Sequence, residues 1–175
     1  MIAGGRIAMA LAALLAAAGC QAQTPSHGAV PPIDHDRAVL LDAEELAEQG
    51  MAAAYEAMAP RLRAIGVTPD RLTETVNSGT ASYSVRFRGR NYPISLPAED
   101  DAMARARATV AFFEIVNAQL GTTSYRFYAL NADNELAGIL LTRADYRRAM
   151  ATTRRATDRP YLPALSPPWF GQPHD

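Results

Sequence analysis

The sequence of 175 residues has no lysine, one cysteine and three histidines, and each scarcity excludes a class of chemistry. All 17 basic residues are arginine, so Schiff-base catalysis, a serine–lysine dyad and a lysine-dependent phosphate loop are excluded. The lone cysteine, Cys20, cannot form a disulfide within the chain. His27, His35 and His174 lie near the two ends, outside the core-forming patterns, so we expect no histidine triad, zinc cluster or histidine base. We therefore expect neither a metal nor a cofactor.

A short apolar run follows Arg6 and ends at the cysteine. Ile7–Ala18 consists only of Ile, Ala, Met and Leu, and its twelve residues are fewer than the roughly 20 that a transmembrane helix needs. The length is instead typical of the apolar middle of a cleavable secretory signal. The run closes with Ala17-Ala18-Gly19-Cys20, which resembles the lipobox of bacterial lipoproteins, although Ala17 stands where that motif usually has Leu.

This resemblance implies a location for the protein. In the lipoprotein family the cysteine carries the lipid and becomes the mature N-terminus, so Cys20 would anchor the chain to a membrane. In Gram-negative lipoproteins an Asp after the cysteine favours the inner membrane, so Gln21 points to the outer membrane with the domain facing the periplasm. The alternative is an ordinary signal peptide that is cleaved near Ala22.

Composition divides the chain into four segments. Residues 1–19 are the predicted signal peptide, and residues 20–38 are the lipidated Cys with a flexible tether, because polar residues, Pro and Gly dominate there. Residues 39–158 are predicted to form a single α+β domain. Residues 159–175, the C-terminal strap, are rich in Pro but too apolar for a linker, so we expect the strap to pack on the domain. The alternative is an aromatic–proline ligand for another protein.

The hydrophobic periodicity of residues 39–158 predicts helices alternating with hairpins. A helix over 42–66, interrupted by Pro60, precedes a hairpin over 82–96 in which apolar and polar residues alternate. A helix over 99–120, a hairpin over 125–142 and a final helix to about 153 follow. The order α-ββ-α-ββ-α predicts an α+β fold with an antiparallel sheet of two β-hairpins and helices on one face. The recurring ββα pattern also suggests a duplication.

The acidic and polar clusters each have a structural explanation beside a chemical one. Glu99, Asp100 and Asp101 could form an acid–base pair or a hard-metal site, but acids at a helix start also complement its dipole. A second cluster has oxygen-bearing side chains at alternate positions, as a calcium loop does, but it lacks the distal glutamate of such a loop, and a hairpin turn explains it equally well. Its members are Asn131, Asp133 and Glu135.

Arginine supplies the candidate binding residues. Arg86, Arg88 and Arg90 cluster on the polar side of the first hairpin, and Arg147 and Arg148 belong to an arginine-rich last helix. Arginine binds carboxylates and phosphates through paired hydrogen bonds, so these residues could recognise an acidic protein or an anionic polymer. The alternative is that they form solvated faces with acidic partners in the same chain.

Two functions remain open. Removal of residues 1–19 leaves 156 of the 175 residues, with 16 arginines and 18 acidic residues; the formal charge of −2 does not favour nucleic acid. We expect a lipid-anchored, non-catalytic binding domain, such as an inhibitor, an immunity-type protein or an accessory subunit, whose partner is an envelope protein or anionic polymer. The alternative is a small envelope hydrolase that uses Asp and Glu. Two carboxylates in one pocket would favour the hydrolase.

Overall fold

The computed structural model describes residues 33–132 and 135–175, which belong to one compact unit. Two three-residue 3-10 turns, His35–Arg37 and Ala156–Asp158, lie near its ends. The strands are β1 (Val39–Leu41), β2 (Leu72–Asn77), β3 (Ser82–Phe87), β4 (Arg90–Ser95), β5 (Tyr125–Ala132) and β6 (Glu135–Thr142). The helices are α1 (Ala43–Ala47), α2 (Met51–Ala64), α3 (Asp101–Gln119) and α4 (Arg143–Thr152).

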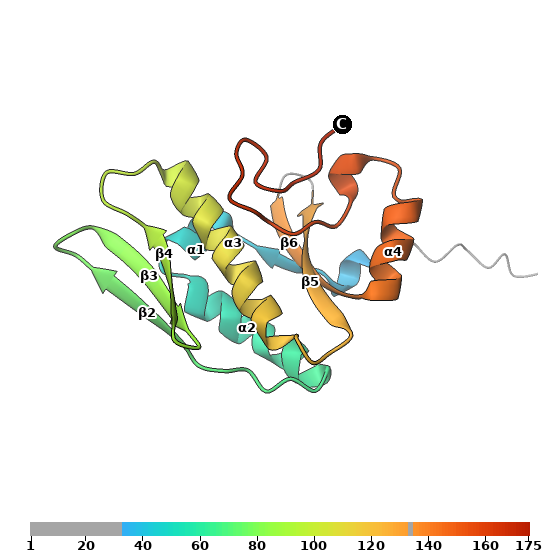
Figure 1. Cartoon of the computed structure of the whole chain (residues 1–175), viewed down its shortest axis with the longest axis horizontal. Coiled ribbons are helices and arrows are strands. Elements are labelled where there is room, and N and C mark those ends of the chain that lie inside the picture. Colours follow the sequence, from blue (N-terminus) through green and yellow to red (C-terminus); the bar gives the residue numbers. More distant parts are fainter. Residues whose placement is uncertain (1–32, 133–134) are drawn as a thin grey trace, which may run out of the picture. The chain divides into compact units, whose positions relative to one another are not determined.

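The strands form two antiparallel three-stranded sheets, one in the order β1-β6-β5 and the other in the order β2-β3-β4. Helix α3 lies between the two sheets, and α4 lies beyond β5 and β6 (Figure 1). The α+β class is confirmed. The structure differs from the expectation of one sheet, because the hairpins β3–β4 and β5–β6 belong to separate sheets and each gains one strand. The duplication of a ββα unit stays a prediction.

The two hairpins cannot join because the outer edge of β5 is already occupied. The Asn117 side chain of α3 bonds both backbone groups of Phe127, and the Tyr161 backbone bonds both backbone groups of Ala129. Further along the same edge, the Tyr125 N–H donates to Thr123 Oγ1 at 3.1 Å. These backbone donors and acceptors of β5 already have partners, so a strand of the other hairpin could not form hydrogen bonds with them.

The β1-β6-β5 sheet is buried on both faces, which corrects the expectation that helices cover one face only. Phe127 and Ala129 face the larger core, which α2, α3 and the other sheet complete. Leu130 and Ile139 face a second, smaller core with Ile33 and Ala149 of α4. The apolar stretch from Leu136 to Leu141 is typical of a strand buried on both sides, so the sequence carried this signal. The β2-β3-β4 sheet keeps one face open, as the alternation predicted.

The first predicted helix is broken at a different place from the one expected. Pro60 lies inside α2, and the break comes between α1 and α2, where Gln49 has a φ of 74°. The chain passes so closely over α1 at Gly50 that a Cβ there would lie 2.6 Å from Glu45 Cγ. Asp42 starts α1 as predicted, because its side chain accepts from the N–H groups of Glu44 and Glu45 at 2.8 Å and 3.2 Å.

Packed residues occur before residue 39, although the sequence assigned residues 20–38 to the tether and began the domain at residue 39. Ile33 is 4% exposed and packs in the smaller core. Among the described residues, the two cores draw on elements from Ile33 through to Tyr161 of the strap. Within that part, no helix combines the length and apolar character needed to cross a membrane.

Candidate binding groove

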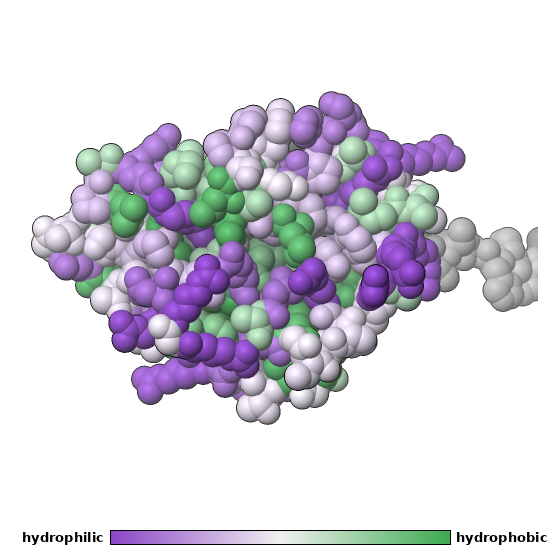
Figure 2. Space-filling view, viewed as in Figure 1, coloured by the Kyte–Doolittle hydropathy of each residue, from purple (hydrophilic) through white to green (hydrophobic). Residues whose placement is uncertain are grey.

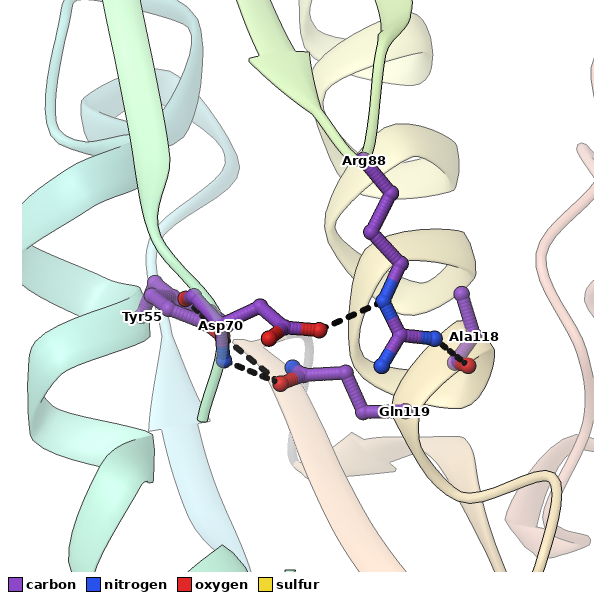
Figure 3. A network of polar contacts seen from close by, with 5 residues as sticks. All are labelled: Tyr55, Asp70, Arg88, Ala118 and Gln119. Atoms are coloured by element: carbon purple, nitrogen blue, oxygen red, sulfur yellow. Dashed lines mark hydrogen bonds and ion pairs between the residues drawn. The ribbon is translucent and has the colours of Figure 1, made fainter. Parts of the chain in front are cut away.

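The three arginines of the first hairpin do not share one face, which corrects the expected arginine surface. Arg88 forms the hairpin turn with Gly89, where φ is 48° and 79°, as a type I′ turn requires. Its Nε contacts Asp70 at 2.5 Å and its Nη1 donates to the Ala118 carbonyl at 2.6 Å (Figure 3). Arg88 therefore joins the turn to the C-terminal end of α3.

Arg90 also contacts other residues of the same chain. It lies on the α3 side of β4, where Nη2 pairs with Glu114 of α3 at 2.9 Å and the guanidinium lies 4.5 Å from the centroid of the Tyr92 ring. Of the three, only Arg86 lies on the open face of the β2-β3-β4 sheet, and it forms no ion pair with the described residues. Arg88 and Arg90 thus match the alternative that these arginines pair with acidic residues of the same chain.

Arg147 and Arg148 lie on α4, away from the first hairpin (Figure 1). Arg148 is exposed and stands 3.5 Å from Asp145 one turn earlier. Arg147 is exposed and, within the described part, pairs with no acid. The first hairpin and α4 therefore carry separate groups of arginines, as the sequence placed them, and a binding role for Arg86, Arg88, Arg90, Arg147 and Arg148 stays a prediction.

The acidic cluster at the start of α3 has a structural role. Asp100 caps the helix by accepting from the Ala102 N–H at 2.9 Å, and Asp101 lies in the first turn. Glu99 forms an ion pair with Arg107, whose Nε also donates to the Ile94 carbonyl at 3.1 Å. Burial lowers the pKa of the Arg107 guanidinium from its ordinary value.

Two other predicted sites cannot be placed in full. Cys20 and Asp133 lie outside the described residues, while Asn131 and Glu135 lie near the ends of β5 and β6. Among residues 33–132 and 135–175, no three His, Cys, Asp or Glu side chains come close enough to hold a metal ion.

The C-terminal strap does lie on the domain, but it is held mainly at its two ends. Tyr161 pairs with Ala129 through hydrogen bonds of 2.8 Å and 2.9 Å, and Asp175 Oδ1 accepts from the Ala156 N–H at 3.0 Å. Between these points the backbone bonds are internal to the strap, such as Phe170 N–H to the Ser166 carbonyl at 2.9 Å. The strap is thus a loop that closes on itself.

The apolar side chains of the strap remain partly in solvent, which departs from the expectation that they would be buried. Trp169 is 52% exposed and stacks on His174 with 4.7 Å between ring centroids. Leu162 and Leu165 are 39% and 48% exposed. Apolar atoms accordingly reach the surface where α3 and the strap meet (Figure 2).

An open groove lies where β1 leads into α1, and we call it the acidic groove. Its volume is about 580 Å³, and α3 and the start of β6 supply its other walls. In the part of the chain that the structure describes, four carboxylates and one guanidinium line it. These charged residues are Asp42, Glu44, Glu45, Glu135 and Arg105. The four acids are exposed, and Arg105 forms no ion pair with any described residue.

A second hollow adjoins the acidic groove, and we call it the aromatic cavity. Its volume is about 250 Å³, and it shares Ala43, Arg105 and Leu136 with the acidic groove. One wall is a stripe of short side chains on α3 and the opposite wall is the strap. The residues lining these two walls include Ala102, Ala106, Val110, Tyr161, Trp169 and Phe170.

The sequence did not predict this pair of hollows. Glu44 and Glu45 follow a helix cap, and their acidity is explained locally by the helix dipole. Arg105 and Trp169 are far from them in sequence. The packing of α1 against α3 places Glu44 and Glu45 around one hollow with Arg105, and the packing of the strap against α3 places Trp169 around the other. The one available signal was an aromatic pair, Trp169-Phe170, in a Pro-rich segment.

The comparisons with known proteins supply no family. No protein-family model matches the chain, and no curated protein or solved structure matches it significantly. The acidic groove and the aromatic cavity are therefore the features that point to a function.

Proposed function

We propose that this chain is a lipid-anchored protein of the bacterial envelope whose folded part is a non-catalytic binding domain. The lipobox-like Ala17-Ala18-Gly19-Cys20 supports the anchor and an outer-membrane location facing the periplasm. The observation that carries the binding function is the acidic groove with its adjoining aromatic cavity, because it combines exposed charge with an apolar hollow of the kind that binds ligands.

The anchor is tested by replacing Cys20 with Ser. The wild-type chain should incorporate labelled palmitate in a bacterial host, and Cys20→Ser should not, because only the thiol accepts the lipid. Incorporation into the Cys20→Ser chain would disprove the anchor. A Gln21→Ala variant, which keeps the cysteine, serves as the matched control for labelling.

The binding function is tested by capture of envelope proteins on the immobilised domain. Filling the aromatic cavity with Ala102→Arg should reduce capture, since Ala102 is exposed near the start of α3 and lines the cavity. Ala151→Arg places the same side chain on an exposed position of α4 that lines neither hollow. Equal capture by both variants would exclude the two hollows as the binding site.

The second candidate function is a small envelope hydrolase, and the four carboxylates of the acidic groove favour it. A carboxyl group that donates a proton near neutral pH is usually held protonated by burial or by a close second carboxylate. Asp42, Glu44, Glu45 and Glu135 are exposed, and Asp42 is engaged as the cap of α1. Cleavage of a captured partner by the wild-type domain, abolished by Glu44→Gln or Glu135→Gln, would establish the hydrolase instead.

A further inference from the structure

We infer that the acidic groove and the aromatic cavity together bind an extended, basic and apolar peptide segment of a partner protein. This rests on the proposed binding function and names the chemistry of its partner. It does not depend on the lipid anchor. Three features of the described residues support it: the charge of the groove, the apolar lining of the cavity, and an unpaired backbone on β1.

The charge of the groove selects a cationic segment. Glu44, Glu45 and Glu135 project from α1 and β6 into a hollow in which the other ionic groups of the described residues are Asp42 and one base, Arg105. The excess of negative charge attracts arginine or lysine side chains and repels acidic ones. Of the two partners that the sequence suggested, an envelope protein with a basic segment fits this groove, whereas an anionic polymer fits the outward Arg86 instead.

The cavity selects an apolar side chain beside the cation. Ala102, Ala106 and Val110 leave a shallow depression on α3, and Trp169 and Phe170 stand opposite on the strap. The half-exposed indole of Trp169 would lose solvent contact when a leucine or an aromatic side chain enters. A large aromatic anchor at the centre of a contact is typical of strong interfaces.

The backbone of β1 offers hydrogen bonds to an extended chain. Ala129 uses its N–H and C=O for Tyr161, so Gly138, which faces Ala129, turns its own groups toward Val39 of β1. The next residue, Leu40, therefore points its N–H and C=O away from β6. Leu40 lines the acidic groove, is 68% exposed and has no backbone partner among the described residues. A peptide strand could pair there.

The test uses a defined probe, a capped pentapeptide of alternating arginine and leucine. It is titrated into residues 20–175 carrying Cys20→Ser, and binding is followed by calorimetry. Two further pentapeptides separate the contributions: glutamate replaces arginine in one, and serine replaces leucine in the other. We expect binding of the arginine–leucine peptide, loss of affinity by at least about tenfold for each of the others, and weaker binding at higher salt.

The charge contribution is tested on the protein side. The triple variant Glu44→Gln, Glu45→Gln, Glu135→Gln keeps the side-chain volumes and should weaken binding about tenfold. Conversely, Arg105→Gln should tighten binding, because it removes the one base that lines either hollow in the described structure.

A matched control removes three acids that lie outside both hollows. The variant changes exposed acids of the first 3-10 turn, the α1 C-cap and α2, and should leave affinity unchanged. Equal weakening by the control and groove variants would show attraction to the overall charge of the domain, and would overturn the proposal. The control substitutions are Asp36→Asn, Glu48→Gln and Glu56→Gln.

The position of the peptide is read from Trp169, the only tryptophan in the chain. The arginine–leucine peptide contains no tryptophan, so any change in emission comes from Trp169. Binding should shift the emission to shorter wavelength as the ring leaves water, and Ala102→Arg should abolish both the shift and the binding. Binding without a change at Trp169 would place the peptide elsewhere and overturn the inference.

Failure of this inference differs from failure of the proposed function. Suppose that none of the peptides binds, while an envelope protein is still captured and the groove substitutions do not change its capture. The inference is then wrong and the binding function stands. If the chain self-associates and peptide competes with the second copy, the occupant is another copy of this chain, and the inference is overturned in that form.

Discussion

Asn117 of α3 and Phe127 of β5 are joined by two hydrogen bonds, so a helix side chain completes the edge of a sheet. Asn117 Nδ2 donates to the Phe127 carbonyl at 2.9 Å, and its Oδ1 accepts from the Phe127 N–H at 2.8 Å. An amide side chain offers the same donor and acceptor as a peptide group, which makes Asn suited to this place. The pairing fixes α3 against one of the two sheets that it separates.

Replacing Asn117 with Leu should destabilise the domain by about 2–4 kcal/mol, because two partly buried backbone groups lose their partners. Asn117→Asp keeps the acceptor and loses the donor, so an intermediate loss is expected. The measurement is urea unfolding followed by circular dichroism. Asn91→Leu, at an exposed position of β4, is the matched control. Equal losses from Asn117→Leu and Asn91→Leu would show that the two bonds contribute nothing.

Gly138 provides the second prediction, because the Phe127 ring occupies the space that a side chain would need. A Cβ on Gly138 would lie 2.0 Å from Phe127 Cζ, in the middle of the larger core. Gly138→Ala should therefore cost about 1–3 kcal/mol or more through overpacking. Gly121→Ala should cost much less, since no atom lies within 4 Å of its Cβ. A Gly138→Ala chain as stable as wild type would refute this packing.

Much of the secondary structure could be predicted from the sequence, because periodicity and caps act locally. The hairpin at Arg88-Gly89, the capped start of α1 at Asp42 and the Thr142 cap of α4 all follow from nearby residues. Strand β2 also carries a local signal, since its Leu72-Thr-Glu-Thr-Val-Asn77 run is rich in β-branched residues. The three residues of β1 are too few to carry a period.

The separation into two sheets and the binding groove could not be predicted in this way. The edge of β5 is occupied by Asn117 and Tyr161, and nothing in their local sequence marks either as a partner of that strand. The acidic groove likewise depends on long-range packing, because Glu45 and Arg105 line it together although they are far apart in the sequence. Such contacts depend on tertiary packing, which outweighs local preference.

The strap yields a third prediction, which differs from the one that its composition alone would give. Complete burial of Trp169 would make its removal cost about 3–5 kcal/mol. Since the side chain is 52% exposed, Trp169→Ala should cost about 1 kcal/mol or less. Phe113→Ala, which removes a ring that is 2% exposed and stacks on Phe127, supplies the contrast and should cost the full 3–5 kcal/mol or so. Similar losses would mean that Trp169 is a core residue.

Tyr83 gives a prediction for alkaline pH. Burial, followed by its hydrogen bond to Glu74, raises the pKa of Tyr83 well above its ordinary value of 10.0. The protonated Tyr83 hydroxyl therefore contributes fully to the free energy of unfolding below about pH 10. This contribution is lost as the pH rises further, because the unfolded chain releases a proton that the folded chain retains. Wild type should lose about 1.4 kcal/mol per pH unit more than Tyr83→Phe between pH 10 and 12.

The check on Tyr83 is urea unfolding at several pH values. Below about pH 9 the two chains should differ by a constant amount, which reports the lost hydrogen bond to Glu74. Above about pH 10 their stabilities should converge as the pH rises. Parallel curves over the whole range would show that the hydroxyl keeps its proton no better in the folded chain than in the unfolded one.

The last prediction separates two arginines of the first hairpin, Arg86 on strand β3 and Arg88 in the turn. Arg88 contacts Asp70 at 2.5 Å and the Ala118 carbonyl at 2.6 Å, whereas Arg86 lies on the open sheet face and forms no ion pair among the described residues. Arg88→Ala should cost about 1–2 kcal/mol, since a half-exposed ion pair contributes at most about 1 kcal/mol and the bond to the carbonyl adds a similar amount. Arg86→Ala should change stability by less than about 0.5 kcal/mol. A double-mutant cycle with Asp70→Ala isolates the ion pair, and a coupling near zero would attribute the loss to the Ala118 contact alone. Because only Arg86 can be removed without disturbing the turn, Arg86→Ala is the variant that tests whether the open face binds an anionic partner.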